Sequence, residues 1–169
     1  MSPRIVLIGP PGAGKSSIGR GLAKVLELDF ADTDTLIEVD QSKSVSQIFI
    51  DDGEPTFRAV EERICLRTLE NFHGVLALGG GAVLSQAVQE KLRHIDGEVV
   101  FLDVSLAVAA PRVGFNRDRP LLLKNPRQQW QVHMDSRRPT YEELATISID
   151  VGDRSVAKIV KELVTRIQT

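Results

Sequence analysis

The hydrophobic positions of this chain fall into two alternating patterns. Short apolar runs that are typical of buried parallel strands lie at residues 4–8, 75–79, 98–104 and 146–151, with a weaker run at 28–32. Apolar residues at helical spacing predict helices over residues 15–27, 34–41, 45–51, 55–72, 85–95, 105–112, 126–144 and 155–168. Strands that alternate with helices indicate parallel βαβ units with right-handed crossovers. The pattern therefore predicts a three-layer α/β domain with five strands and with helices on both faces.

The connection between the first strand and the first helix carries a phosphate-binding motif. Residues 9–16 read Gly-Pro-Pro-Gly-Ala-Gly-Lys-Ser, which is G-x-x-x-x-G-K-[ST] in full. Glycines let the backbone curl so that its N–H groups point at an anion, and the helix that follows adds the positive end of its dipole. We expect Lys15 to reach the β- and γ-phosphates and the Ser16 hydroxyl to ligate Mg²⁺. A glycine-rich turn that binds nothing is the less favoured alternative.

Composition narrows the class of protein further. The chain has 169 residues, 42% of them hydrophobic, which fits one domain over residues 1–169 and a monomer. Twenty-one Lys and Arg against 23 Asp and Glu leave a formal charge of −2, so no basic surplus indicates a nucleic-acid or membrane partner. The lone Cys65 excludes an internal disulfide and is expected to be a buried structural thiol. With neither a signal peptide nor a membrane-length apolar run, a cytoplasmic location is expected.

Two carboxylates follow the second strand, in Asp32-Thr33-Asp34. In a domain of this class ligands bind at the carboxyl ends of the strands, where the phosphate-binding loop also lies. One carboxylate could hold a water of the Mg²⁺ shell, and the other could orient an alcohol or accept its proton. Taken alone, the pair is explained more simply as the N-cap of the helix that starts near Leu36.

Three further groups suggest an anionic acceptor. Arg58 and Glu61 stand at i, i+3 and could form a fixed fork for a carboxylate, although a surface salt bridge would have the same spacing. Glycines at 79–81 end the third strand and favour close approach of a ligand over a plain turn before Ser85. Arg137 could complete an anion clamp or could belong to a solvated helix end.

A loop that carries two arginines lies between two of the predicted helices. Residues 113–126 are rich in loop formers and carry Arg117 and Arg119, which is typical of a lid over a phosphate site. Asp103 ends a strand as a Walker-B aspartate would, but an ordinary strand-end carboxylate is preferred because Asp32 already offers an Mg²⁺ partner. The three histidines show no metal-ligand spacing.

Taken together, the motifs resemble the shikimate kinase family. The matching segments are G-x-x-G-x-G-K-S at 9–16, D-T-D at 32–34, G-E-x-x-F-R-x-x-E at 53–61, G-G-G at 79–81, R-P-L-L at 119–122 and R-x-P-x-Y at 137–141. The resemblance implies a P-loop fold like that of nucleoside monophosphate kinases, with a parallel sheet in the order 2-3-1-4-5, an acceptor-binding region at about 33–61 and the lid. It also implies ATP-dependent phosphorylation of the shikimate 3-hydroxyl, on the pathway to chorismate and aromatic amino acids.

The resemblance also implies a role for each matching residue. The ATP site would comprise Gly12, Ala13, Gly14, Lys15, Ser16, Ser17, Arg119 and, beside adenine, Arg112 and Arg154. The shikimate site would comprise Asp34, Arg58, Gly79, Gly80, Gly81, Arg137, Phe49, Phe57 and Glu61. Lys15, Asp34 and Arg119 would be catalytic, and Mg²⁺ would be held by Ser16 and, through water, by Asp32. Pro111 is expected to interrupt the helix just before Arg112, which argues against the adenine contact of that residue.

Two other functions remain open at this stage. A kinase of the same fold could act on a gluconate-like acid or a nucleoside monophosphate. A nucleotide-dependent switch would bind ATP without transferring phosphate, although Asp34, Arg58 and Arg137 would have no evident use in it. Acceptor-stimulated ADP release distinguishes the three.

Overall fold

Five parallel strands form the centre of the protein in the computed structural model, which describes residues 4–113 and 125–168. The strands are β1 (Ile5–Ile8), β2 (Phe30–Asp32), β3 (Val75–Ala77), β4 (Glu98–Asp103) and β5 (Ile147–Asp150). They pair in the order β2-β3-β1-β4-β5, and Ile5 of the central strand lies opposite Val75 on one side and Glu98 on the other. The predicted fold class and strand order are confirmed. Strands β1 and β3 are buried throughout, which explains their unbroken apolar sequence.

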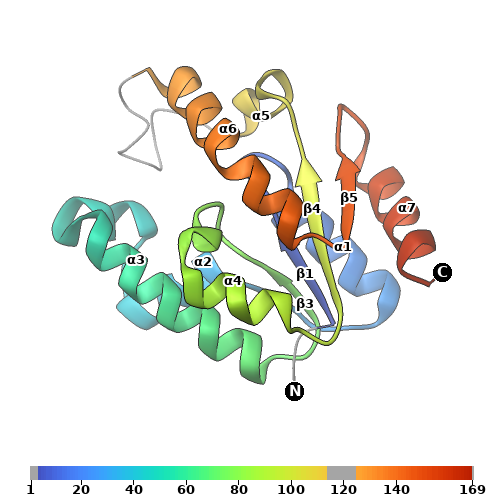
Figure 1. Ribbon diagram of the computed structural model, residues 1–169, viewed down its shortest axis with the longest axis horizontal. Helices are drawn as coiled ribbons and strands as arrows, with labels where there is room; N and C mark the ends of the chain where they lie inside the picture. The colour runs from blue at the N-terminus through green and yellow to red at the C-terminus, as the bar shows by residue number, and fades with distance from the viewer. Residues whose placement is uncertain (1–3, 114–124, 169) are drawn as a thin grey trace.

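Helices cover both faces of this sheet (Figure 1). The helices are α1 (Lys15–Leu26), α2 (Thr33–Gln41), α3 (Val45–Asn71), α4 (Gln86–Arg93), α5 (Leu106–Val113), α6 (Pro126–Leu144) and α7 (Val156–Gln168), with a short 3₁₀ turn η1 (Ala82–Leu84). Helices α1 and α7 pack together on one side, and α3, α4 and α6 lie on the other (Figure 1). None of the helices in the described ranges is both long and apolar enough to cross a bilayer.

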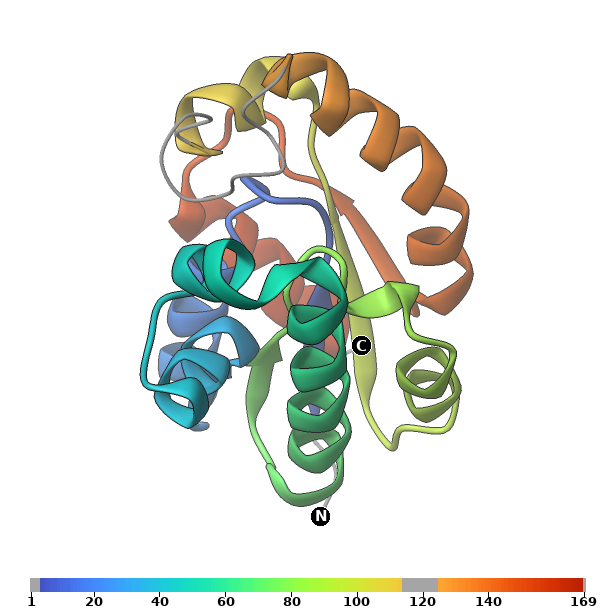
Figure 2. The ribbon, with the colours of Figure 1, turned by 90° about the vertical axis from the view of Figure 1, so that its left-hand side faces the viewer.

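The two helices predicted at 45–51 and 55–72 form one bent element, α3. Gly53 has φ 85° and ψ 167°, a conformation outside the helical region that glycine adopts without a Cβ penalty. Figure 2 shows the two parts of α3 running in different directions. Pro55 sits at the start of the second part, where its missing N–H costs little. The second part of α3 begins beside the carboxyl end of β3, because Arg58 and Glu61 lie against the glycines that follow this strand.

The expectation that Pro111 interrupts its helix is wrong. Helix α5 continues through Pro111 to Val113. The proline stands in the last turn, so it removes one intrahelical hydrogen bond and leaves no long helix to be kinked. Arg112 consequently keeps a helical position beside the phosphate-binding loop.

Cys65 lies in the apolar core, as the sequence indicates, and its side chain is fully buried. Burial is the main cause that raises the pKa of this thiol, and the charge of Glu61 adds to it. A protonated, enclosed thiol of this kind is a packing group.

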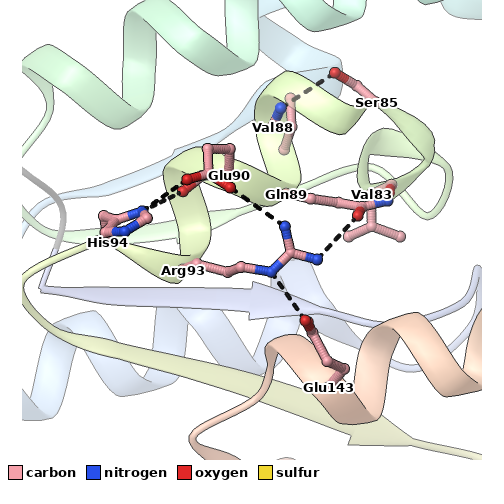
Figure 3. A network of polar contacts seen from close by, with 8 residues as sticks. All are labelled: Val83, Ser85, Val88, Gln89, Glu90, Arg93, His94 and Glu143. Atoms are coloured by element: carbon pink, nitrogen blue, oxygen red, sulfur yellow. Dashed lines mark hydrogen bonds and ion pairs between the residues drawn. The ribbon is translucent and has the colours of Figure 1, made fainter.

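Helix α6 is tied to α4 by a network of polar contacts (Figure 3). Arg93 Nε donates to Glu143 Oε1 over 2.9 Å, and its guanidinium also contacts Gln89 and Glu90. Ser85 begins α4 by accepting a hydrogen bond from the backbone N–H of Val88. The partners are exposed, so these ion pairs contribute little to stability and mainly set how α6 meets α4.

Candidate functional site

The phosphate-binding loop connects β1 to α1 and is shaped by its glycines. Gly9, Gly12 and Gly14 all have positive φ. A Cβ on Gly9 would lie 2.7 Å from the carbonyl oxygen of Leu102, and one on Gly12 would lie 2.9 Å from Ala109. The loop therefore lies so close to β4 and α5 that side chains at these positions would not fit.

Two side chains donate hydrogen bonds to backbone carbonyls of this loop. Lys15 Nζ donates to the carbonyl oxygens of Gly9 and Pro10 at 2.7 and 2.9 Å. Trp130 of α6 donates its indole N–H to the carbonyl oxygen of Pro11 over 2.9 Å. Trp130 is also buried in the core, and nothing in the spacing of apolar residues along α6 indicates that this side chain meets the loop.

One cavity of about 580 Å³ runs along the loop and continues to both sides of it. Site residues predicted from the sequence that line it are Gly12, Gly14, Lys15, Ser16, Ser17, Asp32, Asp34, Gly79, Gly80, Arg112 and Arg154. Apolar side chains of Val113, Val151, Val156 and Ile159 line it as well. Ala13, in the loop itself, is fully buried and does not line the cavity.

Asp32 contacts both the loop and helix α2. The Ser16 hydroxyl donates to its Oδ2 in a short hydrogen bond, and its Oδ1 accepts from the backbone N–H of Asp34 over 2.9 Å. Asp32 therefore caps helix α2 with one carboxylate oxygen and contacts Ser16 with the other.

A hydroxyl beside a carboxylate is a donor set that fits Mg²⁺. This ion prefers oxygen ligands, keeps several waters and is commonly completed by substrate phosphates. Among the described residues no cluster of three or more His, Cys, Asp or Glu side chains could hold a metal by itself. Ser16 and Asp32 thus suit an ion that arrives with a nucleotide.

The glycine loop after β3 is enclosed by three charged side chains. A Cβ on Gly79 would lie 2.9 Å from both Asp34 Oδ1 and Glu61 Oε2, and one on Gly81 would lie 2.3 Å from Arg58 Nη1. The Gly79 N–H donates to Thr33 Oγ1 over 3.1 Å. The loop needs glycine because the protein's own charged groups approach it, and Gly79 and Gly80 still line the cavity.

The pair of Arg58 and Glu61 is largely removed from solvent. Arg58 Nη1 donates to Glu61 Oε1 over 2.7 Å, while its Nε and Nη2 face Glu54 Oε2 at 3.4 and 3.3 Å. The Arg58 guanidinium also lies over the Phe57 ring, 5.3 Å from its centroid. The interpretation as a surface salt bridge is wrong for Glu61, whose side chain is only 4% exposed.

Helix α6 brings a second arginine to the same region. Arg137 lines a small cavity with His133, Tyr141 and the prolines of the phosphate-binding loop. Burial, then the charges of Arg137 and Arg58, lower the pKa of His133, and Glu54 opposes them. Charges from α3 and α6 therefore act on the same histidine, which indicates that the two helices face each other here.

Other predicted site residues have different surroundings. Phe57 is buried in an apolar cluster formed by residues of α2 and α3 and stacks on Phe49, with ring centroids 4.7 Å apart. Arg112 Nη1 donates to the Gly12 carbonyl over 3.3 Å. Arg154 pairs with Glu162 over 2.8 Å. Arg119 and the rest of the predicted lid at 114–124 lie outside the described residues.

Asp103 has a structural partner, as the preferred interpretation of the sequence expected. Both of its carboxylate oxygens accept from Arg138, at 2.8 and 2.9 Å. This bidentate pair joins the end of β4 to α6. Neither Arg138 nor Tyr141 was singled out as a site residue from the sequence, although Tyr141 stands one helical turn after Arg137.

A P-loop that shares its cavity with the carboxylates of Asp32 and Asp34, on a parallel sheet of this order, is typical of P-loop kinases that act on small molecules. The shikimate kinase family model matches residues 11–168. The chain is 43% identical to the shikimate kinase of Rhodococcus jostii over 168 residues and 45% identical to that of Rhodococcus erythropolis over 169, with 99% of each chain covered. The solved shikimate kinase from Acinetobacter baumannii in complex with shikimate superposes with a TM-score of 0.92 at 31% identity, covering 99% of this chain and 93% of that one. This chain belongs to the shikimate kinase family.

Proposed function

We propose that this protein transfers the γ-phosphoryl group of ATP to the 3-hydroxyl of shikimate, giving shikimate 3-phosphate and ADP for chorismate synthesis. The observation that carries the proposal is the single cavity in which Lys15 and Ser16 of the P-loop stand with Asp34 and Gly80. Such a cavity can hold a triphosphate and an acceptor alcohol together. The family relationship, and the relative that binds shikimate, support this choice of acceptor.

On the nucleotide side, we assign the phosphates to the backbone of residues 12–17 and to Lys15. The Lys15 ammonium would exchange the Gly9 and Pro10 carbonyls for phosphate oxygens when ATP binds. Mg²⁺, held by Ser16 and through water by Asp32, would supply charge neutralisation at the phosphates. Arg112 and Arg154, which line the cavity, would flank the adenine base, and Arg119 of the lid would close over the phosphates.

On the acceptor side, Asp34 would orient the attacking hydroxyl and take its proton. Shikimate is a small anion with three hydroxyls, so its recognition calls for arginine forks and a carboxylate. Arg58 and Arg137 would bind its carboxylate, and the backbone at Gly79, Gly80 and Gly81 would contact its ring. The Phe49, Phe57 and Glu61 side chains would shape this region from behind, since Phe57 and Glu61 are buried against Arg58.

Catalysis in this scheme comes from positioning and electrostatics. Phosphoryl transfer needs the hydroxyl, the phosphorus and the leaving oxygen in line, with the developing charge neutralised. The sheet holds the two substrate groups at the carboxyl ends of neighbouring strands, β1 and β3. We further propose that residues 1–169 act as one domain and as a monomer, with no nucleic-acid partner.

The test is ADP release from Mg-ATP with shikimate, gluconate or AMP as acceptor. Stimulation by shikimate alone supports the proposal. Stimulation by gluconate or AMP would keep the kinase and replace the acceptor. ATP binding without stimulation by any of the three would contradict the proposal and favour a nucleotide-dependent switch.

A further inference from the structure

We infer that Tyr141 is a positioning residue, which holds the Gly80 loop and Arg137 in the arrangement that binds the acceptor; this inference rests on the proposed function. The Tyr141 hydroxyl donates to the carbonyl oxygen of Gly80 over 2.5 Å. The tyrosine is fully buried, and the bond joins α6 to the loop after β3, 61 residues away in sequence.

The hydroxyl is not needed to fill the core. The Tyr141 ring stacks on Phe101 with centroids 5.1 Å apart, and phenylalanine would make the same contact. Burying a hydroxyl costs free energy unless it is hydrogen-bonded, so the core alone gives no reason for an oxygen at this position. What the oxygen adds is the bond to Gly80, in the small cavity that Tyr141 lines together with Arg137.

Arg137 stands one turn earlier on α6 and lines the same small cavity as Tyr141. Burial raises the pKa of Tyr141 to about 12, and the charge and hydrogen bonding of Arg137 oppose that rise. Near neutral pH the phenol therefore keeps its proton and remains a donor to Gly80. The oxygen of the same hydroxyl can still accept a hydrogen bond from the Arg137 guanidinium while its proton is donated to Gly80.

The bond also affects Arg58. Because the peptide unit is planar, fixing the Gly80 carbonyl fixes the direction of the Gly81 N–H that shares its plane. Arg58 packs directly against Gly81, where a Cβ would be 2.3 Å from Nη1. The position of the loop thus bears on Arg58, and Tyr141 contributes to the placement of both arginines assigned to the acceptor carboxylate.

The test compares Tyr141→Phe with Thr68→Val in the full-length protein. Thr68 is a matched control because its buried hydroxyl donates to the Ile64 carbonyl over 2.6 Å, within α3 and outside the cavity. We expect Tyr141→Phe to raise the KM for shikimate about tenfold, which corresponds to the loss of one hydrogen bond of ordinary strength. The kcat and the KM for ATP should stay within about twofold, and Thr68→Val should leave all three within that range.

A second readout does not depend on the acceptor. In ¹⁵N–¹H spectra, Tyr141→Phe should shift the amide signals of residues 79–81 and the Nε–H signal of Arg137, and Thr68→Val should leave them in place. Unchanged signals would overturn the inference, as would an unchanged KM for shikimate or an equal rise in Thr68→Val. Absence of shikimate-stimulated turnover in the unmodified protein would contradict the proposed function instead, and the spectra would then decide on Tyr141.

Discussion

Arg58 Nη1 and Glu61 Oε1 lie 2.7 Å apart at the point where the bent helix α3 meets the glycine loop. Glu61 is buried, whereas about a quarter of the Arg58 side chain remains exposed. A buried carboxylate thus orients a guanidinium that is partly exposed. This is the arrangement expected of an arginine that must present a fixed fork to an anion, because a fixed fork loses less entropy on binding.

Removal of Arg58 should weaken acceptor binding selectively. We expect Arg58→Ala to raise the KM for shikimate by about 10- to 100-fold, since hydrogen bonds to charged groups contribute about 1.5–3 kcal/mol. The KM for ATP should change little. Steady-state kinetics with each substrate varied in turn measures both values.

Arg63→Ala is the matched control for that experiment. Arg63 lies on the same helix and pairs with Asp40 over 2.7 Å, but it is exposed and does not line the cavity. A similar KM increase in both variants would assign the effect to helix stability and remove Arg58 from the acceptor site.

Gly81→Ala should displace Arg58 without straining the backbone. Gly81 has φ −99° and ψ 3°, which alanine tolerates, and the atoms that its Cβ would meet belong to the Arg58 guanidinium. We expect a folded protein whose KM for shikimate is at least about fivefold higher, a loss of about 1 kcal/mol. A normal KM together with a normal melting temperature would show that the exact place of Arg58 is unimportant.

Asp34 should matter for turnover rather than for folding. Asp34→Asn keeps the size of the side chain, and the backbone N–H of residue 34 can still donate its hydrogen bond to Asp32. The substitution removes only the carboxylate that would accept a proton. General-base contributions are typically about 10²–10⁴-fold, so we expect kcat to fall by about 100-fold or more. The control is Asp40→Asn on the same helix, which should keep its kcat; a near-normal kcat in Asp34→Asn would exclude both orienting and proton-accepting roles.

His133 should make the folded state sensitive to acid. Its pKa is lowered in the folded protein, mainly by burial and then by Arg137, so the unfolded chain binds a proton more readily. This contribution to stability is complete above the unfolded pKa of about 6.5 and is lost as the pH falls toward the lower folded pKa. Urea unfolding on both sides of this window should show a smaller acid loss in His133→Gln than in the unmodified protein.

His94→Gln serves as the control for the pH experiment. His94 is exposed at the end of α4, where Glu90 lies 3.3 Å from its ring nitrogen. The His94→Gln variant should lose as much stability at low pH as the unmodified protein does. Identical acid losses in His133→Gln and the unmodified protein would show that other groups cause the sensitivity.

Local sequence determined the individual strands, the P-loop and most of the helices, because each depends on residues close together in the chain. The order of the strands followed from the family resemblance instead, since each pair joins distant segments such as Ile5 and Val75. The run from Ile5 to Ile8, the positive-φ glycines and the Lys-Ser pair specify a strand, a loop and a helix start by themselves. The same holds for the Asp32 cap, which reaches only two residues along the chain. The prediction that Pro111 interrupts its helix is wrong, because the helix ends only two residues later and the proline stands in its last turn.

Tertiary structure decided which distant groups share a site. The spacing of Arg58 and Glu61 was visible, but only the bend at Gly53 and the packing of α3 bury the glutamate. The contacts of Trp130 with Pro11 and of Tyr141 with Gly80 span 119 and 61 residues. Such contacts depend on how α6 crosses the end of the sheet, and periodicity along one helix shows which face is apolar without showing what that face meets.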